Sequence, residues 1–543
     1  MQTHGVQLGL EAREYDHLGP QAQTSSGYRN LFGDADRDGR YKGLADRDKS
    51  REMFRWLSGR FGQSYAWPNG ADENAKIPAG YTYLAQFVIH DTVQSLADLP
   101  DVESGKDWLR NDRSGRLILD GIYGKGMSAD PLLYGICPAF PAARGFLRIG
   151  GREGDDPVSY RDLPRVPCPF SGKWAYADVL IADSRNDDNL IIAQLTALFH
   201  LLHNIVYSEL NNLYQNKYTD RFIFSIARKA VTFIYRKVVI EDFLKRVLYP
   251  EVYEEYKNRG REALVDDPND SRMPLEFSHA AARFGHFMVR DHYEINSVLR
   301  DSDTGLRSML TQTSASRPWA MPLDGRWLIE WKRLFGPPGT AGLLYSRRLG
   351  PELARVLVQP DLLRDQLGGV GSLPYVDFVR GSESNLRSLS GIVNHPRFPG
   401  YVREASPLLL RDNEVDTQPI IEWLETPILG MPQLPREYVN LITQDVPLLL
   451  FVMFEAAKTV YPRGNVKPKD ILEGECLGPM GSFIIAEFIF GEYWRTHELI
   501  ENDAATQEAV GKIFGQQVPG SMPTLIDEIA RRKGWDGADA RFW

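Results

Sequence analysis

One long stretch of helical periodicity restricts the fold more than any other feature of the chain. It runs from Asn189 to Leu213 and reads NLIIAQLTALFHLLHNIVYSELNNL. Its apolar residues recur at the spacing of an α-helix, and Asp187 or Asp188 is placed to cap its first turn. A helix with so much apolar surface needs other elements around it, so we expect it in the centre of a large core.

Further helical stretches predict the rest of the architecture. Ala227–Leu248 and Ser278–Val289 repeat the helical spacing, and so do IIEWLETPIL and NLITQDVPLLLFVMFEAAKTV. Ser128–Pro169 is rich in Gly and Pro and reads as a long loop. Alternating strand patterns are scarce, so the sequence predicts a mainly α-helical fold with little β structure. We expect an irregular extension over residues 1–60 and one large domain over residues 61–543.

Composition disfavours several classes of function. An apolar content of 43% and a charged content of 25% are ordinary for a globular protein. The net charge of −9 disfavours nucleic-acid binding, which needs clustered Lys and Arg. We see no membrane span and no signal peptide, and therefore expect a cytoplasmic protein by default, with secretion by a route that needs no N-terminal signal as the alternative. Cys137, Cys168 and Cys476 are too few and too scattered for a disulfide framework or a zinc site. Nothing indicates the oligomeric state.

The segment AQFVIHDTVQS places a glutamine and a histidine on one helical face. Gln86 and His90 are four residues apart. A neutral histidine on an apolar face can accept a proton and return it. Taken alone, the pair is better explained as hydrogen-bonded core residues.

An arginine stands at the start of the long helix. Arg185 precedes Asp188 by three residues, and an arginine there can stabilise developing negative charge in a pocket. An ion pair with a neighbouring aspartate is the simpler explanation. His200 and His203 have the spacing of a metal pair, but no third ligand is apparent, so we expect both to pack in the core.

Two later segments contain residue types that suit a haem-binding site. His286 follows Arg283 and Gly285 in ARFGHFMVRDH, where the glycine leaves room for a flat group. Such a histidine can ligate haem iron. Asp377 in LPYVDFVRG can orient a ligating histidine, and Arg380 can pair with a carboxylate. Each segment alone is better explained by a core histidine or a surface ion pair.

Taken together and in this order, the segments resemble the motifs of the cyclooxygenase-superfamily (animal-type) haem peroxidases, which include shorter bacterial members. The matching segments are QxxxHD at Gln86–Asp91, DxRxxDNxxI at Asp183–Ile192 followed by HN at His203–Asn204, RFGH at Arg283–His286, DxxRG at Asp377–Gly381, and LGPMGSFIIAEFIFG at Leu477–Gly491. Each motif is weak alone, but their order and spacing make the set specific. The resemblance runs from about Tyr81 to Gly491, which is most of the chain.

The resemblance implies a single large helical haem-peroxidase domain that binds haem b. Such an enzyme reduces hydrogen peroxide and oxidises a small organic donor or a (pseudo)halide through a ferryl intermediate. His90 would move the proton of the peroxide, Arg185 would stabilise the charge that builds as the O–O bond breaks, and Gln86 would organise the distal pocket. General acid–base transfer of this kind contributes roughly 10²–10⁴-fold.

The resemblance also implies how the haem would be held. His286 would be the proximal iron ligand, backed by Asp377, and Arg283 and Arg380 would pair with the haem propionates. Family members often form ester bonds from an aspartate and a glutamate to the haem. Ile89 replaces the first of these and Asp188 the second, so we hypothesise one ester link through Asp188.

The family's calcium site is only partly matched. Oxygen ligands, which calcium requires, are available from Asp91, Ser114, the carbonyl of Arg116 and Asp120. Ile118 stands where the family places another aspartate, and its side chain cannot ligate a cation. The resemblance therefore predicts a calcium site that is weakened or altered.

Two alternatives to a peroxidase remain open at this point. A fatty-acid oxygenase or dioxygenase of the same fold would normally have its radical-forming tyrosine three residues before the proximal histidine. Arg283 stands there instead, which disfavours that chemistry. A non-catalytic haem-binding protein is disfavoured by Gln86, His90 and Arg185 occurring together, since holding haem needs only the proximal side.

Overall fold

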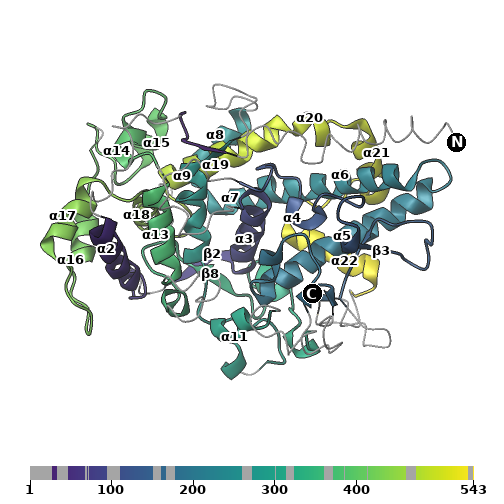
Figure 1. The fold of residues 1–543 in the computed structure, drawn as a ribbon, viewed down its shortest axis with the longest axis horizontal. Helices are drawn as coiled ribbons and strands as arrows, with labels where there is room; N and C mark the ends of the chain where they lie inside the picture. Colours follow the sequence, from purple (N-terminus) through teal and green to yellow (C-terminus); the bar gives the residue numbers. More distant parts are fainter. Residues whose placement is uncertain are drawn as a thin grey trace.

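The computed structural model describes most of the chain and shows a mainly helical protein (Figure 1). The described residues are 27–33, 47–67, 70, 72–94, 111–150, 161–166, 178–259, 272–299, 301–313, 323–359, 371–384, 386–412, 414–459, 473–535 and 542. Cys168 and the first 26 residues lie outside this part.

The long apolar stretch forms the central helix α5 (Leu190–Tyr214), as predicted. The side chain of Asn189 caps it by accepting the N–H groups of Ile191 and Ile192, so the prediction of Asp187 or Asp188 as the cap is wrong. Helix α5 packs against α6 (Asp220–Val238) and α3 (Gly80–Thr92). In Figure 1, α3 lies near the middle of the molecule, and α5 and α6 extend from there towards the right-hand side.

The other two predicted long helices are interrupted. Over Ala227–Leu248, helix α6 ends at Val238 and continues through a π-helical turn (Val239–Phe243) into α7 (Leu244–Val247). Over Ser278–Val289, helix α9 (Leu275–Ser278), a 3-10 turn (Ala281–Arg283) and α10 (Phe284–Phe287) follow one another. Ala280 causes this second break, because its backbone lies outside the helical range at φ −137° and ψ −81°.

The remaining longer helices surround this centre. They are α2 (Arg47–Arg60), α8 (Pro250–Arg259), α13 (Leu373–Glu383), α16 (Gln418–Glu425), α17 (Arg436–Gln444), α18 (Leu448–Lys458), α19 (Pro479–Arg495), α21 (Ala504–Phe514) and α22 (Met522–Lys533). By length and composition, α5 is the single helix in the described part that could cross a membrane, and 94% of its most apolar segment is buried inside the protein. Helices α17 and α18 would pass the same test together, but they are bent by 83°.

The β structure is small, as expected. The described residues contain four two-stranded sheets: β1 (Tyr28–Arg29) with β7 (Met273–Pro274), β2 (Glu73–Pro78) with β8 (Tyr345–Arg347), β3 (Tyr134–Gly135) with β4 (Phe146–Leu147), and β5 (Arg165–Val166) with β6 (Asp178–Val179). The first pair is parallel and the others are antiparallel. The predicted loop Ser128–Pro169 contains the short strands β3, β4 and β5.

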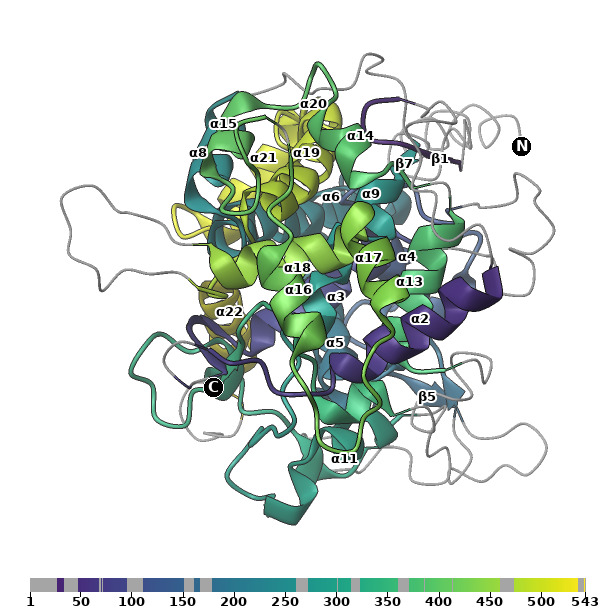
Figure 2. The same ribbon diagram turned by 90° about the vertical axis from the view of Figure 1, so that its left-hand side faces the viewer.

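The expected irregular extension over residues 1–60 is not irregular at its end. Helix α2 lies beside α13 (Figure 2), where the rings of Phe54 and Phe378 stack 5.6 Å apart. Arg51 forms an ion pair with Glu383 at 3.2 Å. Residues 47–60 therefore belong to the helical body, and the domain boundary at residue 60 stays a prediction.

Candidate active site

Helix α3 presents a histidine whose ring is fixed at one nitrogen. His90 is buried, and its Nδ1 lies 2.9 Å from Oδ1 of Asn186. Because this oxygen can only accept, Nδ1 carries the proton and Nε2 keeps its lone pair. Among the described residues, Nε2 of His90 has no hydrogen-bond partner. The ring is therefore held in a tautomer that can accept a proton at Nε2.

The charge state of His90 suits a base. Burial, followed by the positive charge of Arg185, lowers the pKa of His90 to about 3. The imidazole is consequently neutral across the physiological range and available to accept a proton.

Hydrogen bonds within the protein fix the side chain of Arg185. It lies in the 3-10 turn η6 (Ser184–Asp187). Its Nε and Nη2 donate to Asp183 at 3.0 and 2.6 Å, and its Nη1 and Nη2 donate to the carbonyls of Val93 and His90 at 2.7 and 3.0 Å. A guanidinium has five N–H donors, so one Nη1–H remains for a ligand. The simple expectation of an ion pair holds, with Asp183 as the partner.

The start of α5 also anchors the predicted distal glutamine. Oε1 of Gln86 accepts a hydrogen bond from Nδ2 of Asn189 at 3.0 Å, and Asn189 caps α5 through its own side-chain oxygen. Asp188 is half-buried beside this cap, and burial raises the pKa of its carboxyl to about 7. Gln86, His90 and Arg185 are thus all tied to one junction between α3 and the start of α5.

A second fixed imidazole lies on α10. Nδ1 of His286 donates to Oδ2 of Asp377 at 2.8 Å, and the His286 side chain is 30% exposed whereas that of Asp377 is 3% exposed. Among the described residues, Nε2 of His286 has no hydrogen-bond partner. An imidazole held at Nδ1 and open at Nε2 is the arrangement that metal-ligating histidines require.

Cations surround the carboxylate that holds His286. Nε of Arg283 lies 3.6 Å from Oδ1 of Asp377. Burial alone would raise the pKa of Asp377, but His286, Arg283 and Arg380 outweigh it and bring the pKa below its usual range. Asp377 is therefore ionised and can polarise the imidazole of His286.

Helix α3 brings the two halves together. It packs against both η6, which carries Arg185, and α10, which carries His286. A Cβ added at Gly285 would lie 3.6 Å from the Cβ of Ala85, so the backbones approach closely. Three of the five sequence motifs therefore meet at α3, and Asp377 of a fourth joins them through His286.

Three supporting residues were given no role from the sequence, although Asp183 and Asn189 are fixed positions of the DxRxxDNxxI motif. Asn186 fixes the tautomer of His90, Asp183 holds Arg185, and Asn189 holds Gln86. An asparagine directly before an apolar helical stretch is a capping signal that could have identified Asn189. No local pattern indicates a contact between Asn186 and a residue 96 positions earlier.

The predicted calcium ligands are partly occupied by hydrogen bonds within the protein. Oδ2 of Asp91 accepts the N–H of Leu119 at 3.1 Å, and Oδ2 of Asp120 accepts the hydroxyl of Ser114 at 2.6 Å. The N–H of Arg116 donates to that same Ser114 hydroxyl at 3.3 Å. No group of three or more His, Cys, Asp or Glu side chains able to hold a metal occurs in the described ranges. Calcium also accepts hydroxyl and carbonyl oxygens, and Oδ1 of Asp91 is buried with no partner in the described part of the chain, so calcium at Asp91, Ser114, Arg116 and Asp120 stays a prediction.

The paired histidines of α5 are structural, as expected. His200 contacts the carbonyl of Arg148 through Nδ1 at 2.8 Å. His203 contacts the carbonyl of Gly145 at 2.9 Å and the hydroxyl of Tyr123 at 3.1 Å. Both rings hold neighbouring loops against α5 and do not form a metal pair.

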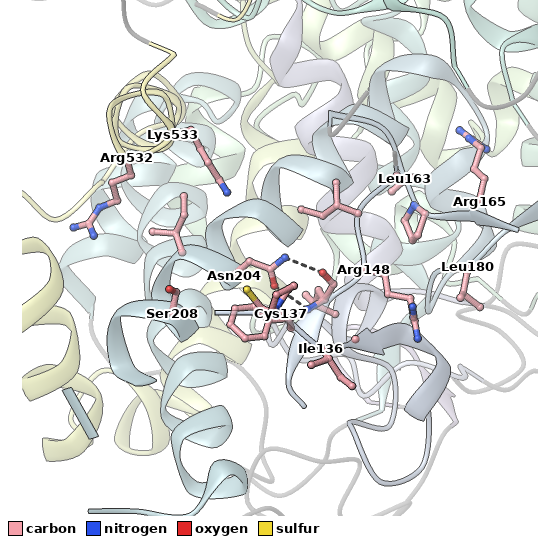
Figure 3. Close-up of a pocket in the computed structure, with 18 of the residues that line it drawn as sticks. Ile136, Cys137, Arg148, Leu163, Arg165, Leu180, Asn204, Ser208, Arg532 and Lys533 are labelled. Carbon is pink, nitrogen blue, oxygen red and sulfur yellow. Dashed lines mark hydrogen bonds between the residues drawn. The ribbon is translucent and has the colours of Figure 1, made fainter. Parts of the chain in front are cut away.

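Figure 3 shows a cavity of about 690 Å³. Segments β3–β4, β5, α5 and α22 line it, including Cys137, Arg148, Asn204 and Lys533. Arg165 of β5 also lines it and pairs at 3.0 Å with Asp187, which belongs to the same turn as Arg185. The Ser128–Pro169 stretch therefore lines a cavity that runs along α5 and reaches the turn that carries Arg185.

Sequence comparison connects the chain to one family. Residues 142–329 match the family model described as "Animal haem peroxidase", a range that contains Arg185 and His286. Thyroid peroxidase of Canis lupus familiaris is 26% identical over 278 residues, covering 47% of this chain and 27% of that protein. Thyroid peroxidase of Homo sapiens is 27% identical over 249 residues, covering 43% and 24%. The match thus spans about a quarter of these relatives.

Structural comparison covers nearly the whole chain. Peroxidase A from Dictyostelium discoideum matches with a TM-score of 0.54 and 12% identity, covering 94% of this chain and 98% of that one. The fatty acid alpha-dioxygenase of Oryza sativa matches with a TM-score of 0.56 and 12% identity, covering 95% and 84%. That of Arabidopsis thaliana has a TM-score of 0.51 and 14% identity, covering 96% and 81%. At these identities the likeness establishes a shared fold.

Proposed function

We propose that this chain is an animal-type haem peroxidase of the cyclooxygenase superfamily that reduces hydrogen peroxide, with haem held by His286 and with His90 as the proton-transferring group. One observation carries the proposal. Two imidazoles on contacting segments are each fixed through Nδ1 and leave Nε2 without a partner among the described residues. The structural His203 has both nitrogens satisfied. His200 also has an Nε2 without a partner in the described part of the chain, but it is held by a backbone carbonyl, whereas Arg185 lies beside His90 and the carboxylate of Asp377 holds His286.

The proximal residues fit a haem. His286 would ligate the iron through Nε2, while the ionised Asp377 accepts the Nδ1 proton and raises the basicity of the ring. Arg283 and Arg380 would pair with the propionates, and the half-buried carboxyl of Asp188 would form one ester link. When bound, the haem supplies the iron that exchanges electrons with peroxide and donor.

The distal residues fit the movement of one proton. His90 would take a proton from hydrogen peroxide at Nε2 and return it to the departing oxygen, which leaves as water. Its lowered pKa keeps it neutral and ready to accept. Arg185 would offset the negative charge that develops on the peroxide, through its positive charge and its remaining N–H. Gln86 would position the peroxide or a water molecule from the neighbouring turn of α3.

The electron donor is proposed to be a small organic molecule or a (pseudo)halide. The second candidate, a fatty-acid oxygenase, draws support from the fold shared with fatty acid alpha-dioxygenases. Against it stands Arg283, which pairs with Asp377 at the position where such enzymes need a tyrosine. We expect no oxygen uptake when an unsaturated fatty acid is added without peroxide, and substantial uptake would favour the oxygenase.

The experiment that tests haem binding compares two histidine variants. We expect the wild-type chain, purified with haem, to show a Soret band, and His286→Ala to lose most of its bound haem. His292→Ala is the matched control, because His292 is exposed in the same segment. Equal haem retention by both variants would refute the assignment of His286.

A third variant separates a catalyst from a haem carrier. His90→Ala should keep the haem spectrum, because the proximal side is intact, but react with hydrogen peroxide roughly 10²–10⁴-fold more slowly. A wild-type protein whose spectrum does not respond to peroxide would instead indicate non-catalytic haem binding.

A further inference from the structure

We propose that the guanidinium of Arg228 takes the place of a structural calcium ion in this chain. The positions that would ligate calcium lie on α3 and on the loop that leads into α4 (Asp120–Tyr123). Arg228 reaches this region from α6 and is 2% exposed. The proposal concerns the stability of the loop and does not depend on haem chemistry.

Arg228 contacts α4 at both of its ends. Its Nη2 lies 3.8 Å from Oδ1 of Asp120, the first residue of the helix. Its guanidinium carbon lies 5.0 Å from the ring centroid of Tyr123, the last residue. The ion pair and the cation–π contact together attach α4 to α6. Both interactions are stronger at a buried site, because water is excluded there. A metal ion bound at Asp120 would attach the loop at the same carboxylate.

Hydrogen bonds already use one oxygen of each carboxylate on the calcium side. Ser114 donates to Oδ2 of Asp120 through both its N–H and its hydroxyl, at 3.2 and 2.6 Å. The N–H of Leu119 donates to Oδ2 of Asp91, whereas Oδ1 of Asp91 is buried without a partner among the described residues. Calcium needs six to eight oxygen ligands, and these two carboxylates offer only Oδ1 of Asp91 and Oδ1 of Asp120, the second of which faces Arg228.

The residue that would complete a calcium site has a different role here. Ile118 is buried in a small apolar cluster with Ile500, and Phe233 of α6 packs against it. An aspartate at this position would place a charge among apolar side chains at a cost of several kcal/mol. The loop is thus packed onto α6 through Ile118 and Arg228, the latter paired with Asp120.

Arginines pair with two of the three buried carboxylates of the region. Arg113 and Arg185 pair with Asp183, and Arg228 pairs with Asp120, whereas Asp91 forms no ion pair among the described residues. A calcium ion bound at Asp120 would lie beside the guanidinium of Arg228 and be repelled by its positive charge.

The loop conformation is held by protein contacts. Leu119 has φ +62°, the sole positive value for a non-glycine residue in the described part of the chain. A left-handed backbone is unfavourable for a residue with a side chain and persists only when its surroundings hold it. The hydrogen bond from the N–H of Leu119 to Oδ2 of Asp91 helps to hold it, and it uses an oxygen that could otherwise ligate a metal.

The first test uses the haem-loaded wild-type protein. We expect no stoichiometric calcium by elemental mass spectrometry, and no shift of the thermal midpoint with millimolar calcium chloride or EDTA. Stoichiometric calcium, or a midpoint lowered by EDTA, would overturn the proposal. The Soret spectrum recorded alongside tests haem binding separately, so failure of this proposal and failure of the proposed function are distinguishable.

The second test replaces the cation. Arg228→Met should lower the thermal midpoint by roughly 5 °C or more, because it leaves Asp120 without its buried partner. We expect millimolar calcium to recover part of this loss. Arg236→Met is the matched control, since Arg236 is a buried arginine of the same helix that pairs with Glu501. Its loss should not respond to calcium.

A more conservative substitution keeps the proposal testable if Arg228→Met does not fold. Arg228→Lys keeps the positive charge and should lose less stability than Arg228→Met. If Arg228→Met does not fold, recovery of soluble protein with the lysine variant would still support a charge-balancing role. Equal losses in the Arg228 and Arg236 methionine variants, with no response to calcium in either, would overturn the proposal.

Discussion

The hydrogen bond between His286 and Asp377 leads to a quantitative prediction about the iron. Asp377 is ionised, 3% exposed, and 2.8 Å from the imidazole nitrogen that it holds. Replacing it with asparagine keeps the size and an acceptor oxygen but removes the negative charge. The imidazole then donates to a neutral group and becomes a weaker base towards the metal. We therefore expect Asp377→Asn to raise the Fe(III)/Fe(II) potential, because the oxidised iron loses more stabilisation.

The size of the shift follows from hydrogen-bond energies. A bond to a charged group contributes about 1.5–3 kcal/mol and one to a neutral group about 0.5–1.5 kcal/mol. The difference is about 1–1.5 kcal/mol. Since 1.36 kcal/mol corresponds to about 59 mV for one electron, the potential should rise by about 40–65 mV.

Spectroelectrochemical titration of the haem-loaded proteins measures this shift directly. Asp503→Asn is a suitable control, because Asp503 caps α21, where asparagine is an equally good cap, and does not contact His286. The Soret position should confirm that His286 still ligates the iron in each variant. An unchanged or lowered potential in Asp377→Asn would refute the reasoning.

Three further predictions concern the distal side. Arg185→Gln removes a positive charge that lowers the pKa of His90, so that pKa rises. The rate of reaction with hydrogen peroxide, which should fall below about pH 3 in the wild type, should then begin to fall at a higher pH. Stopped-flow rates whose pH dependence does not shift would contradict this. Asn186→Ala removes the acceptor that fixes the His90 tautomer and should slow the same reaction roughly 10–100-fold with the Soret band unchanged. One ester link through Asp188 predicts that acidified organic solvent leaves haem on the wild-type chain but extracts it from Asp188→Ala; complete extraction from the wild type would eliminate the link.

Several features of the fold were readable from local sequence. The apolar spacing of α5 identified the central helix to within one residue at each end, because a fully buried helix must be apolar on all sides. The scarcity of strands was equally readable. Interruptions within helices were not, since the break at Ala280 depends on how neighbouring segments pack and no Gly or Pro marks it.

The candidate site likewise has features that the sequence predicts and features that only the structure shows. Sequence alone determined the residue types and their order, because a proton carrier, a cation, an imidazole ligand and its carboxylate must be present whatever the fold. It also indicated that a calcium ligand was missing at Ile118, since an aliphatic side chain cannot bind a cation.

Only the tertiary structure decided which nitrogen of His90 and His286 is free, because the partners Asn186 and Asp377 are 96 and 91 residues distant along the chain. It also decided that Arg185 is already bound to Asp183 and two carbonyls of α3. The position of Arg228 beside Asp120 likewise depends on the packing of α6 against α4. Such pairings bring together groups that are far apart in the chain, and no local periodicity encodes them.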